Sequence, residues 1–120
     1  MRETEREAAT VADAYTPSLD VVFDVLANQR RRLVLYHLHE SGDGIATLEE
    51  ITDYVCASEE SERSASEHRL HVATSLQHAH LPKLEEAGIV EYDQRSETVR
   101  YWHQPSLEEW LEHAFHKERA

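Results

Sequence analysis

Cysteine, glycine and lysine are scarce in this chain of 120 residues, and each shortage narrows what the protein can be. The single cysteine, Cys56, cannot form an intramolecular disulfide, which agrees with a reducing compartment. Only three glycines are present, and no glycine-rich phosphate loop, nucleophile elbow or His-Glu-x-x-His motif occurs. We therefore expect no enzymatic activity and no cofactor.

Long apolar runs are missing as well. No segment approaches the roughly 20 apolar residues that a membrane-spanning helix needs, and the polar stretch 1–7 lacks the apolar core of a signal peptide. We expect a cytoplasmic protein without a membrane partner, and the sequence shows no sign of a small-molecule substrate. The chain is long enough for one domain with a modest core.

Positive charge is also in short supply. The sequence has 24 Asp and Glu against 12 Lys and Arg, a net charge of −12, and only two of its basic residues are lysines. Such a composition is typical of proteins from salt-accumulating archaea, although an ordinary acidic protein is the alternative. At 1 M salt the Debye length is about 3 Å, so distant carboxylates barely repel phosphate. The same salt removes most of the counterion-release drive for DNA binding. Net charge therefore leaves nucleic-acid binding open.

Apolar periodicity predicts a protein that is mainly α with a small β-hairpin, an α+β class. Residues 1–15 are polar and acidic without a strong apolar stripe, and we expect them to be an N-terminal tail. The first helix carries a stripe at helical spacing, made of Leu19, Val22, Phe23 and Leu26. The predicted helix starts are Thr16-Pro17, Asn28, a Thr47–Glu50 capping box, about Ser66, and a Ser106–Glu109 capping box. A minimal strand is expected at 45–46.

The stretch 80–92 joins the fourth helix, about 66–87, to the hairpin. Gly88 follows the last apolar helical position and predicts a helix stop. Two short strands then flank the polar turn 93–97, which predicts a hairpin. The order helix, helix, strand, helix, helix, hairpin, helix indicates a winged helix-turn-helix domain over residues 16–104, with a C-terminal amphipathic helix over 105–120.

This junction resembles the end of the recognition helix and the first wing strand of ArsR-like winged-helix regulators, through His80, Leu81, Leu84, Ala87, Gly88, Ile89 and Val90. Residues 22–33 resemble the first two helices of those regulators. The whole stretch 80–92 is similar to a group of haloarchaeal winged-helix domains of unknown function. The resemblance spans roughly residues 19–102 and implies a transcription regulator that binds double-stranded DNA as a homodimer.

Two features depart from that family. The connection from Val55 to His68 is longer than the three- or four-residue turn of a simple helix-turn-helix. Pro82 lies inside the presumed recognition helix, where it deletes one backbone hydrogen bond and is expected to bend the helix.

The window 68–84 contains no carboxylate, although a fifth of the chain is acidic. A helical wheel directs one set of side chains outward, namely His71, Thr74, Ser75, His78 and Pro82, and another set inward, namely Ala73, Gln77, His80, Leu81 and Leu84. Hydroxyl and imidazole groups contact phosphates and bases through short hydrogen bonds. The predicted DNA-binding residues are Arg69, His71, Thr74, Ser75, His78, Lys83, and Arg95 and Arg100 on the hairpin. The alternative is that the window is acid-free only because it is buried.

The run Arg30 to Arg32 opens the second helix. We expect these arginines to pair with nearby acids, such as Asp20 and Asp24, rather than to contact DNA.

The C-terminal helix carries one clean apolar stripe, made of Leu107, Trp110, Leu111, Ala114 and Phe115. This is too much apolar surface to leave in water. We predict that the stripe forms a homodimer, while packing back onto its own domain is the alternative.

Nine histidines raise the question of a metal site. The pairs His68/His71 and His113/His116 have a spacing of i, i+3 and could share an ion, but the cysteine pair of the related metal sensors is absent. We assign no metal-binding residue. A metal-responsive repressor, and a winged-helix module that binds protein instead of DNA, remain alternatives to the DNA-binding regulator.

Overall fold

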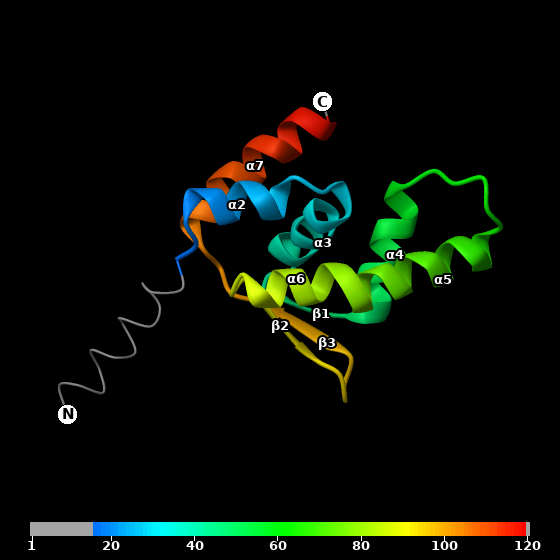
Figure 1. Ribbon diagram of the computed structural model, residues 1–120. Helices are drawn as coiled ribbons and strands as arrows, with labels where there is room; N and C mark the ends of the chain where they lie inside the picture. Colours follow the sequence, from blue (N-terminus) through cyan, green and yellow to red (C-terminus); the bar gives the residue numbers. More distant parts are fainter. Residues whose placement is uncertain (1–15, 120) are drawn as a thin grey trace.

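The computed structural model describes residues 16–119, so the predicted tail at 1–15 lies outside the described residues. The described part is mainly helical with one three-stranded antiparallel sheet, which confirms the α+β class (Figure 1). Its elements, in chain order, are α2 (Leu19–Leu26), α3 (Gln29–Glu40), β1 (Ile45–Thr47), α4 (Leu48–Ser58), α5 (Ala65–Ser75), the π-helical turn η1 (Leu76–His80), α6 (Leu81–Glu86), β2 (Val90–Asp93), β3 (Thr98–Tyr101) and α7 (Pro105–Arg119). None of these helices is long and apolar enough to cross a membrane.

Local capping signals account for several helix starts. Asn28 caps α3 by accepting a hydrogen bond from the backbone N–H of Arg31 at 3.2 Å. Thr47 and Glu50 form the predicted capping box at the start of α4. A second capping box, Ser64 with Glu67, opens α5 and was missed in the sequence.

Two predicted helix starts are wrong by one or two residues. The N-cap of α2 is Ser18, whose hydroxyl accepts from Val21 N–H, rather than Thr16. Helix α7 begins at Pro105, so Ser106 lies inside the helix and makes no capping box with Glu109. Proline is well suited to a first helical position because its missing N–H would have no partner there.

The sheet has the strand order β1-β3-β2. Strands β2 and β3 form the predicted hairpin, with Val90 opposite Tyr101. The minimal strand expected at 45–46 is confirmed as β1, which pairs with the other edge of β3. Gly88 has φ +76° and ends α6 as predicted, because this left-handed conformation is accessible to glycine without strain.

Helices α5, η1 and α6 run on as one long helix across the front of the domain (Figure 1). Within η1 the backbone N–H of Leu81 bonds to the carbonyl of Leu76, five residues back. This wide turn lies directly before Pro82, which lacks an N–H. The helix thus accommodates the proline by a π-turn.

The π-turn also changes which residues of this helix face the core. Val72, Leu76, Leu81 and Leu84 are all completely buried, whereas Ala73 and Gln77 are only half-buried. The helical wheel, which assumes 100° per residue, therefore assigns the wrong inward positions before Leu81. The π-turn inserts one extra residue between Leu76 and Leu81, and this rotates all earlier positions relative to the core.

Helix α7 packs back onto α2 and α3 of its own domain. Leu107 and Leu111 are 0% and 1% exposed, and Phe115 stacks edge-on against Tyr36 with ring centroids 5.1 Å apart. The prediction that the whole stripe forms a dimer surface is thus wrong for Leu107 and Leu111, which belong to the core. Ala114 and Phe115 are half-buried, and Trp110 stays 40% exposed.

Candidate nucleic-acid interface

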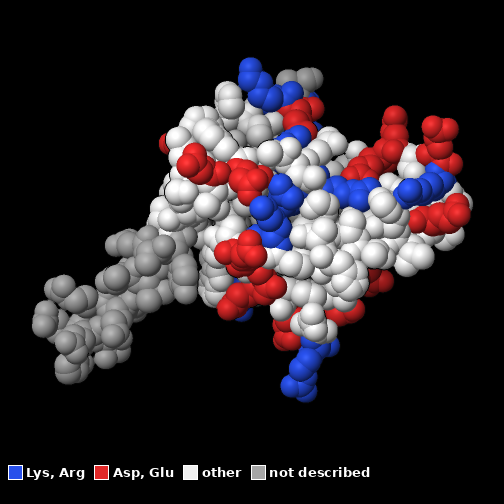
Figure 2. Space-filling view, viewed as in Figure 1, with Lys and Arg blue, Asp and Glu red and all other residues white. Residues whose placement is uncertain are grey.

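Between residues 68 and 84 the outer face of the long helix is free of carboxylates. Its exposed side chains are Leu70, His71, Thr74, His78, Ala79 and Pro82. Figure 2 shows a mostly uncharged surface over the middle of this helix, while acidic side chains gather toward both of its ends. The absence of acid from the window 68–84 therefore cannot be explained by burial alone.

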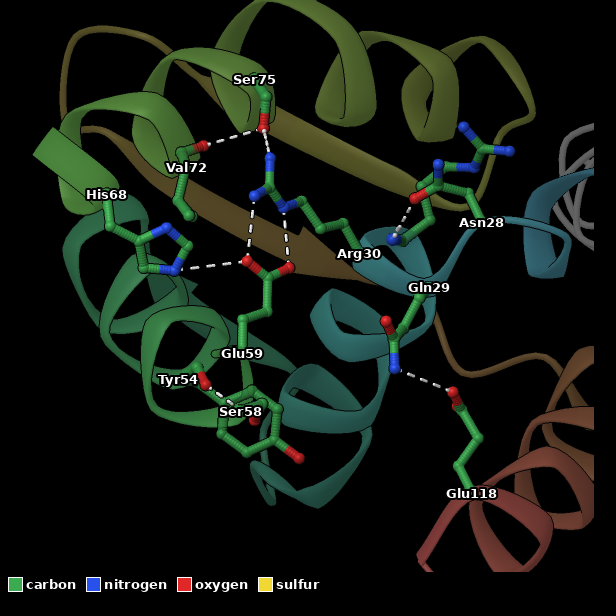
Figure 3. Close-up of polar contacts among 11 residues, drawn as sticks. Asn28, Gln29, Arg30, Tyr54, Ser58, Glu59, His68, Val72, Ser75 and Glu118 are labelled. Carbon is green, nitrogen blue, oxygen red and sulfur yellow. Dashed lines mark hydrogen bonds and ion pairs between the residues drawn. The ribbon is translucent and has the colours of Figure 1, made fainter. Parts of the chain in front are cut away.

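Ser75 does not belong to this face, contrary to the prediction. Its hydroxyl accepts a hydrogen bond from Arg30 Nη1 at 2.9 Å and donates to the carbonyl of Val72 at 3.1 Å (Figure 3). Both functions of the hydroxyl are thus satisfied within the domain. The π-turn after Ser75 shifts the helix register, so position 75 turns toward α3.

Arg30 is held on its other side by Glu59, the C-cap residue of α4. Arg30 Nε and Nη2 donate to the two carboxylate oxygens at 2.7 and 2.9 Å, a bidentate pair (Figure 3). Nε2 of His68 lies 3.4 Å from the same carboxylate. One guanidinium therefore ties α3 to the end of α4 and to the last residue of α5.

The arginine run is structural, as expected, but its partners differ from those predicted. Arg31 donates to the backbone carbonyls of Asp24 and Val25, and Arg32 donates to the carbonyl of Leu26. These carbonyls belong to the C-terminal turn of α2, where basic side chains are favoured.

Arg32 also pairs with Glu118 on α7, at 2.8 Å from Nε and 2.9 Å from Nη2. Tyr36 and Gln29 donate to the same carboxylate. The hydrogen bond and charge of Arg32, with those of Tyr36, lower the pKa of Glu118 to about 2 despite its partial burial.

Two of the predicted DNA-binding residues already have acidic partners. Arg69 is bonded to Asp53, which raises the pKa of the guanidinium, and Lys83 lies 2.8 Å from Asp24. The hydrogen bond and charge of Lys83 lower the pKa of Asp24. Each positive charge is therefore largely offset by a carboxylate of the protein itself. Arg69 and Lys83 are weaker candidates for DNA binding than the sequence suggested.

The hairpin arginines differ from each other. Arg95 lies in the turn between β2 and β3, and its guanidinium forms no ion pair with any residue between 16 and 119. Arg100 lies opposite Glu91 in the register, and its guanidinium is 5.2 Å from the centre of the Trp102 ring. Arg95 is therefore the freer of the two cations.

Two histidines of the long helix, His71 and His80, have lowered pKa values. Desolvation and the charges of Arg63 and Arg30 lower the pKa of His71, and burial with the charges of Arg31 and Arg30 lowers that of His80. A neutral imidazole donates one hydrogen bond and accepts another. His71 on the exposed face can therefore meet either a donor or an acceptor on a base edge.

A second exposed surface is apolar and lies where α2 meets α7. Phe23 and Trp110 stack edge-to-face, with centroids 5.2 Å apart, and are 46% and 40% exposed. Leu19, one turn before Phe23, is 54% exposed. The helical stripe predicted for α2 was thus wrong for Leu19 and Phe23, since Val22, Val25 and Leu26 face the core instead.

No curated protein and no solved structure matches this chain. Residues 23–100, more than half of the chain, match a family described as a domain of unknown function. This protein therefore belongs to the DUF7344 family.

Proposed function

We propose that this protein is a winged-helix transcription regulator that binds double-stranded DNA through the outer face of α5, η1 and α6 and through the tip of the hairpin. One observation carries the proposal. In a chain of net charge −12, the exposed face of the long helix is free of carboxylates from residue 68 to residue 84, and a hairpin whose Arg95 has no ion-pair partner among the described residues follows that helix directly.

The groups on this face suit readout of base edges more than attraction to phosphate. An α-helix fits the major groove of B-DNA, where Thr and His form hydrogen bonds and small apolar groups contact the thymine methyl. Thr74, His71 and His78 supply the polar groups, and Leu70 and Ala79 supply apolar surface. We expect Arg95, in the turn of the hairpin, to contact the DNA backbone or the minor groove.

The acidic composition supports a halophilic source, and the same composition favours binding by short-range contacts. At molar salt the remaining carboxylates are screened within about 3 Å. Specific hydrogen bonds and apolar contacts then contribute more than counterion release, which is weak under these conditions.

A titration of fluorescently labelled duplex DNA at molar potassium chloride tests the proposal. We expect the wild-type chain to bind genomic fragments, and His78→Glu to weaken binding at least about tenfold, because a carboxylate then faces the DNA. His116→Glu is the matched control, since His116 is an exposed histidine on α7 that does not stack on Trp110 of the proposed dimer surface. Equal losses in both variants, or no binding by a folded wild type, would contradict a DNA-binding role for this face.

We also propose a homodimer formed through Leu19, Phe23 and Trp110. A two-fold dimer would present two long helices to successive major-groove segments, about one helical turn apart. The support for it is the exposed aromatic pair, because exposed large apolar groups that cluster mark interaction surfaces.

One observation favours a second role, in which the long helix binds a partner protein. Leu70 is 69% exposed on the carboxylate-free face, the highest value among the exposed large apolar side chains of the described residues. If DNA titration fails while the fold is intact, Leu70→Glu in a pull-down against the protein's own cell extract tests this alternative.

A further inference from the structure

We propose that His39, His103 and Glu108 form a binding site for a Zn²⁺-class divalent metal ion. Residue His39 lies near the end of α3, His103 in the segment after β3, and Glu108 in the first turn of α7. One ligand atom from each residue lies within 4.8 Å of the others. The site is separate from the proposed DNA-binding face and does not depend on it.

The donor atoms are close to the spacing that such an ion requires. Nδ1 of His103 is 2.8 Å from Glu108 Oε2, and Nδ1 of His39 is 3.6 Å from the same oxygen. Zinc bound to nitrogen and oxygen at about 2.0–2.1 Å in a tetrahedral site places neighbouring donors roughly 3.3 Å apart. The side chain of His103 is 49% exposed, so a small rotation can bring its nitrogen into place.

The Nε2 atom of His39 contacts a carboxylate, which leaves Nδ1 free to bind a metal ion. Its Nε2 lies 3.4 Å from Glu112 Oε2, and a carboxylate there favours the proton on Nε2. The unshared pair of Nδ1 is then directed at Glu108. Nδ1 is buried and has no hydrogen-bond partner among residues 16–119. A histidine whose far nitrogen faces a carboxylate is the usual arrangement around protein-bound zinc.

Glu108 is oriented in the same manner. The hydroxyl of Tyr101, a residue only 2% exposed, donates to Glu108 Oε2 at 2.8 Å. An ionised carboxylate has about four acceptor sites on its two oxygens, so the bond from Tyr101 leaves Glu108 able to bind an ion.

Two imidazoles and one carboxylate are a ligand set that suits zinc and leaves a fourth position for water. When the ion binds, the neutral His103 ring carries its proton on Nε2, and Nδ1 becomes a ligand. Such an ion would fasten the start of α7 to α3 and to the segment that follows β3. Its role would then be to stabilise the attachment of the C-terminal helix.

A metal titration of the full chain tests the site. We expect one Zn²⁺ per chain by calorimetry, and one Co²⁺ per chain with visible absorption of the intensity that four-coordinate cobalt shows. His103→Gln and Glu108→Gln should weaken Zn²⁺ binding by about 100-fold or more, and Glu112→Gln by about 10–100-fold through loss of the partner of His39. His113→Gln, which removes an exposed histidine of α7 outside the cluster, should leave the affinity unchanged.

A thermal melt gives an independent readout. Saturating Zn²⁺ should raise the Tm of the wild type and of His113→Gln by about 5 °C or more, but not that of His103→Gln. Circular dichroism verifies that each variant is folded, and His103 is exposed enough for its replacement to be tolerated. Absence of binding to the wild type, equal affinity in all variants, or one ion per two chains would overturn the proposal.

Discussion

Arg30 and Glu59 are joined by two parallel hydrogen bonds, 2.7 Å from Nε to Oε2 and 2.9 Å from Nη2 to Oε1. Their side chains are 19% and 14% exposed, so water competes little with this pair. The third guanidinium nitrogen bonds to Ser75 at the end of α5. The contact therefore sets how the long helix is held against α3 and α4, and the face it presents.

Arg30→Lys should lower the free energy of unfolding by about 1–2 kcal/mol, since an ammonium cannot form the bidentate pair and reach Ser75 together. Denaturant unfolding at molar potassium chloride measures the change. Arg63→Lys is the matched control, because Arg63 is exposed and forms no ion pair with the described residues. Equal stability of the two variants would show that the Arg30 contact contributes nothing.

Glu118 predicts a pH dependence of stability. Its pKa is about 2 in the folded protein against an ordinary value of 4.5, so its contribution is present above about pH 4.5 and is lost as the pH falls toward 2. Glu118→Gln should lower the free energy of unfolding by about 1–2 kcal/mol at pH 7, and the gap to the wild type should close with acid. Melts from pH 7 to pH 2.5 measure it. Glu109→Gln, at an exposed site on the same helix, should have the stability of the wild type at every pH. A stability difference between Glu118→Gln and the wild type that does not change with pH would contradict the role given to Glu118.

Deletion of Ala79 should be tolerated. The long helix buries four side chains completely, those of Val72, Leu76, Leu81 and Leu84. The π-turn adds one extra residue between Leu76 and Leu81. Without Ala79 the same four side chains follow ordinary α-helical spacing, so we expect cooperative unfolding within about 1–2 kcal/mol of the wild type.

Deletion of Asp53 is the control for this experiment, because it removes an exposed residue from a regular α-helix. It rotates the buried Val55 out of the core and should cost several kcal/mol. If both deletions unfold the domain, the π-turn does more than insert one residue.

Trp110→Glu should convert the proposed dimer to a monomer, because it places a charge in an apolar contact between copies. Light scattering after size-exclusion chromatography measures the mass at several protein concentrations. Trp102→Glu is the matched control, since Trp102 is exposed to a similar extent, 46%, and packs against Arg100 rather than against Phe23. A wild type that is monomeric throughout, or dimers that survive Trp110→Glu, would remove the dimer proposal.

Signals that act within a few residues were readable from the sequence. Asn28, the Thr47–Glu50 capping box and the Gly88 stop were all placed correctly, because each depends on hydrogen bonds or backbone conformation inside one turn. The α+β class, the hairpin and the small first strand followed from these signals and from apolar spacing.

The candidate site was harder to predict. The exposure of His71, Thr74 and His78 was anticipated, but the removal of Ser75 from that face depends on Arg30, 45 residues away in sequence. The ion pairs of Arg69 and Lys83 likewise join separate helices. No spacing rule identifies such partners.

The sequence by itself determined, to within one or two residues, where most helices begin, and it showed that the window 68–84 of the long helix carries no acid. Only the tertiary structure decided which faces of the helices are exposed to solvent. In the folded chain Leu107 and Leu111 are buried, while Phe23 and Trp110 stay exposed. The three residues of the proposed metal site, His39, His103 and Glu108, lie together only in the tertiary structure. The physical reason is that capping and periodicity are local, whereas burial and side-chain pairing depend on how distant segments pack.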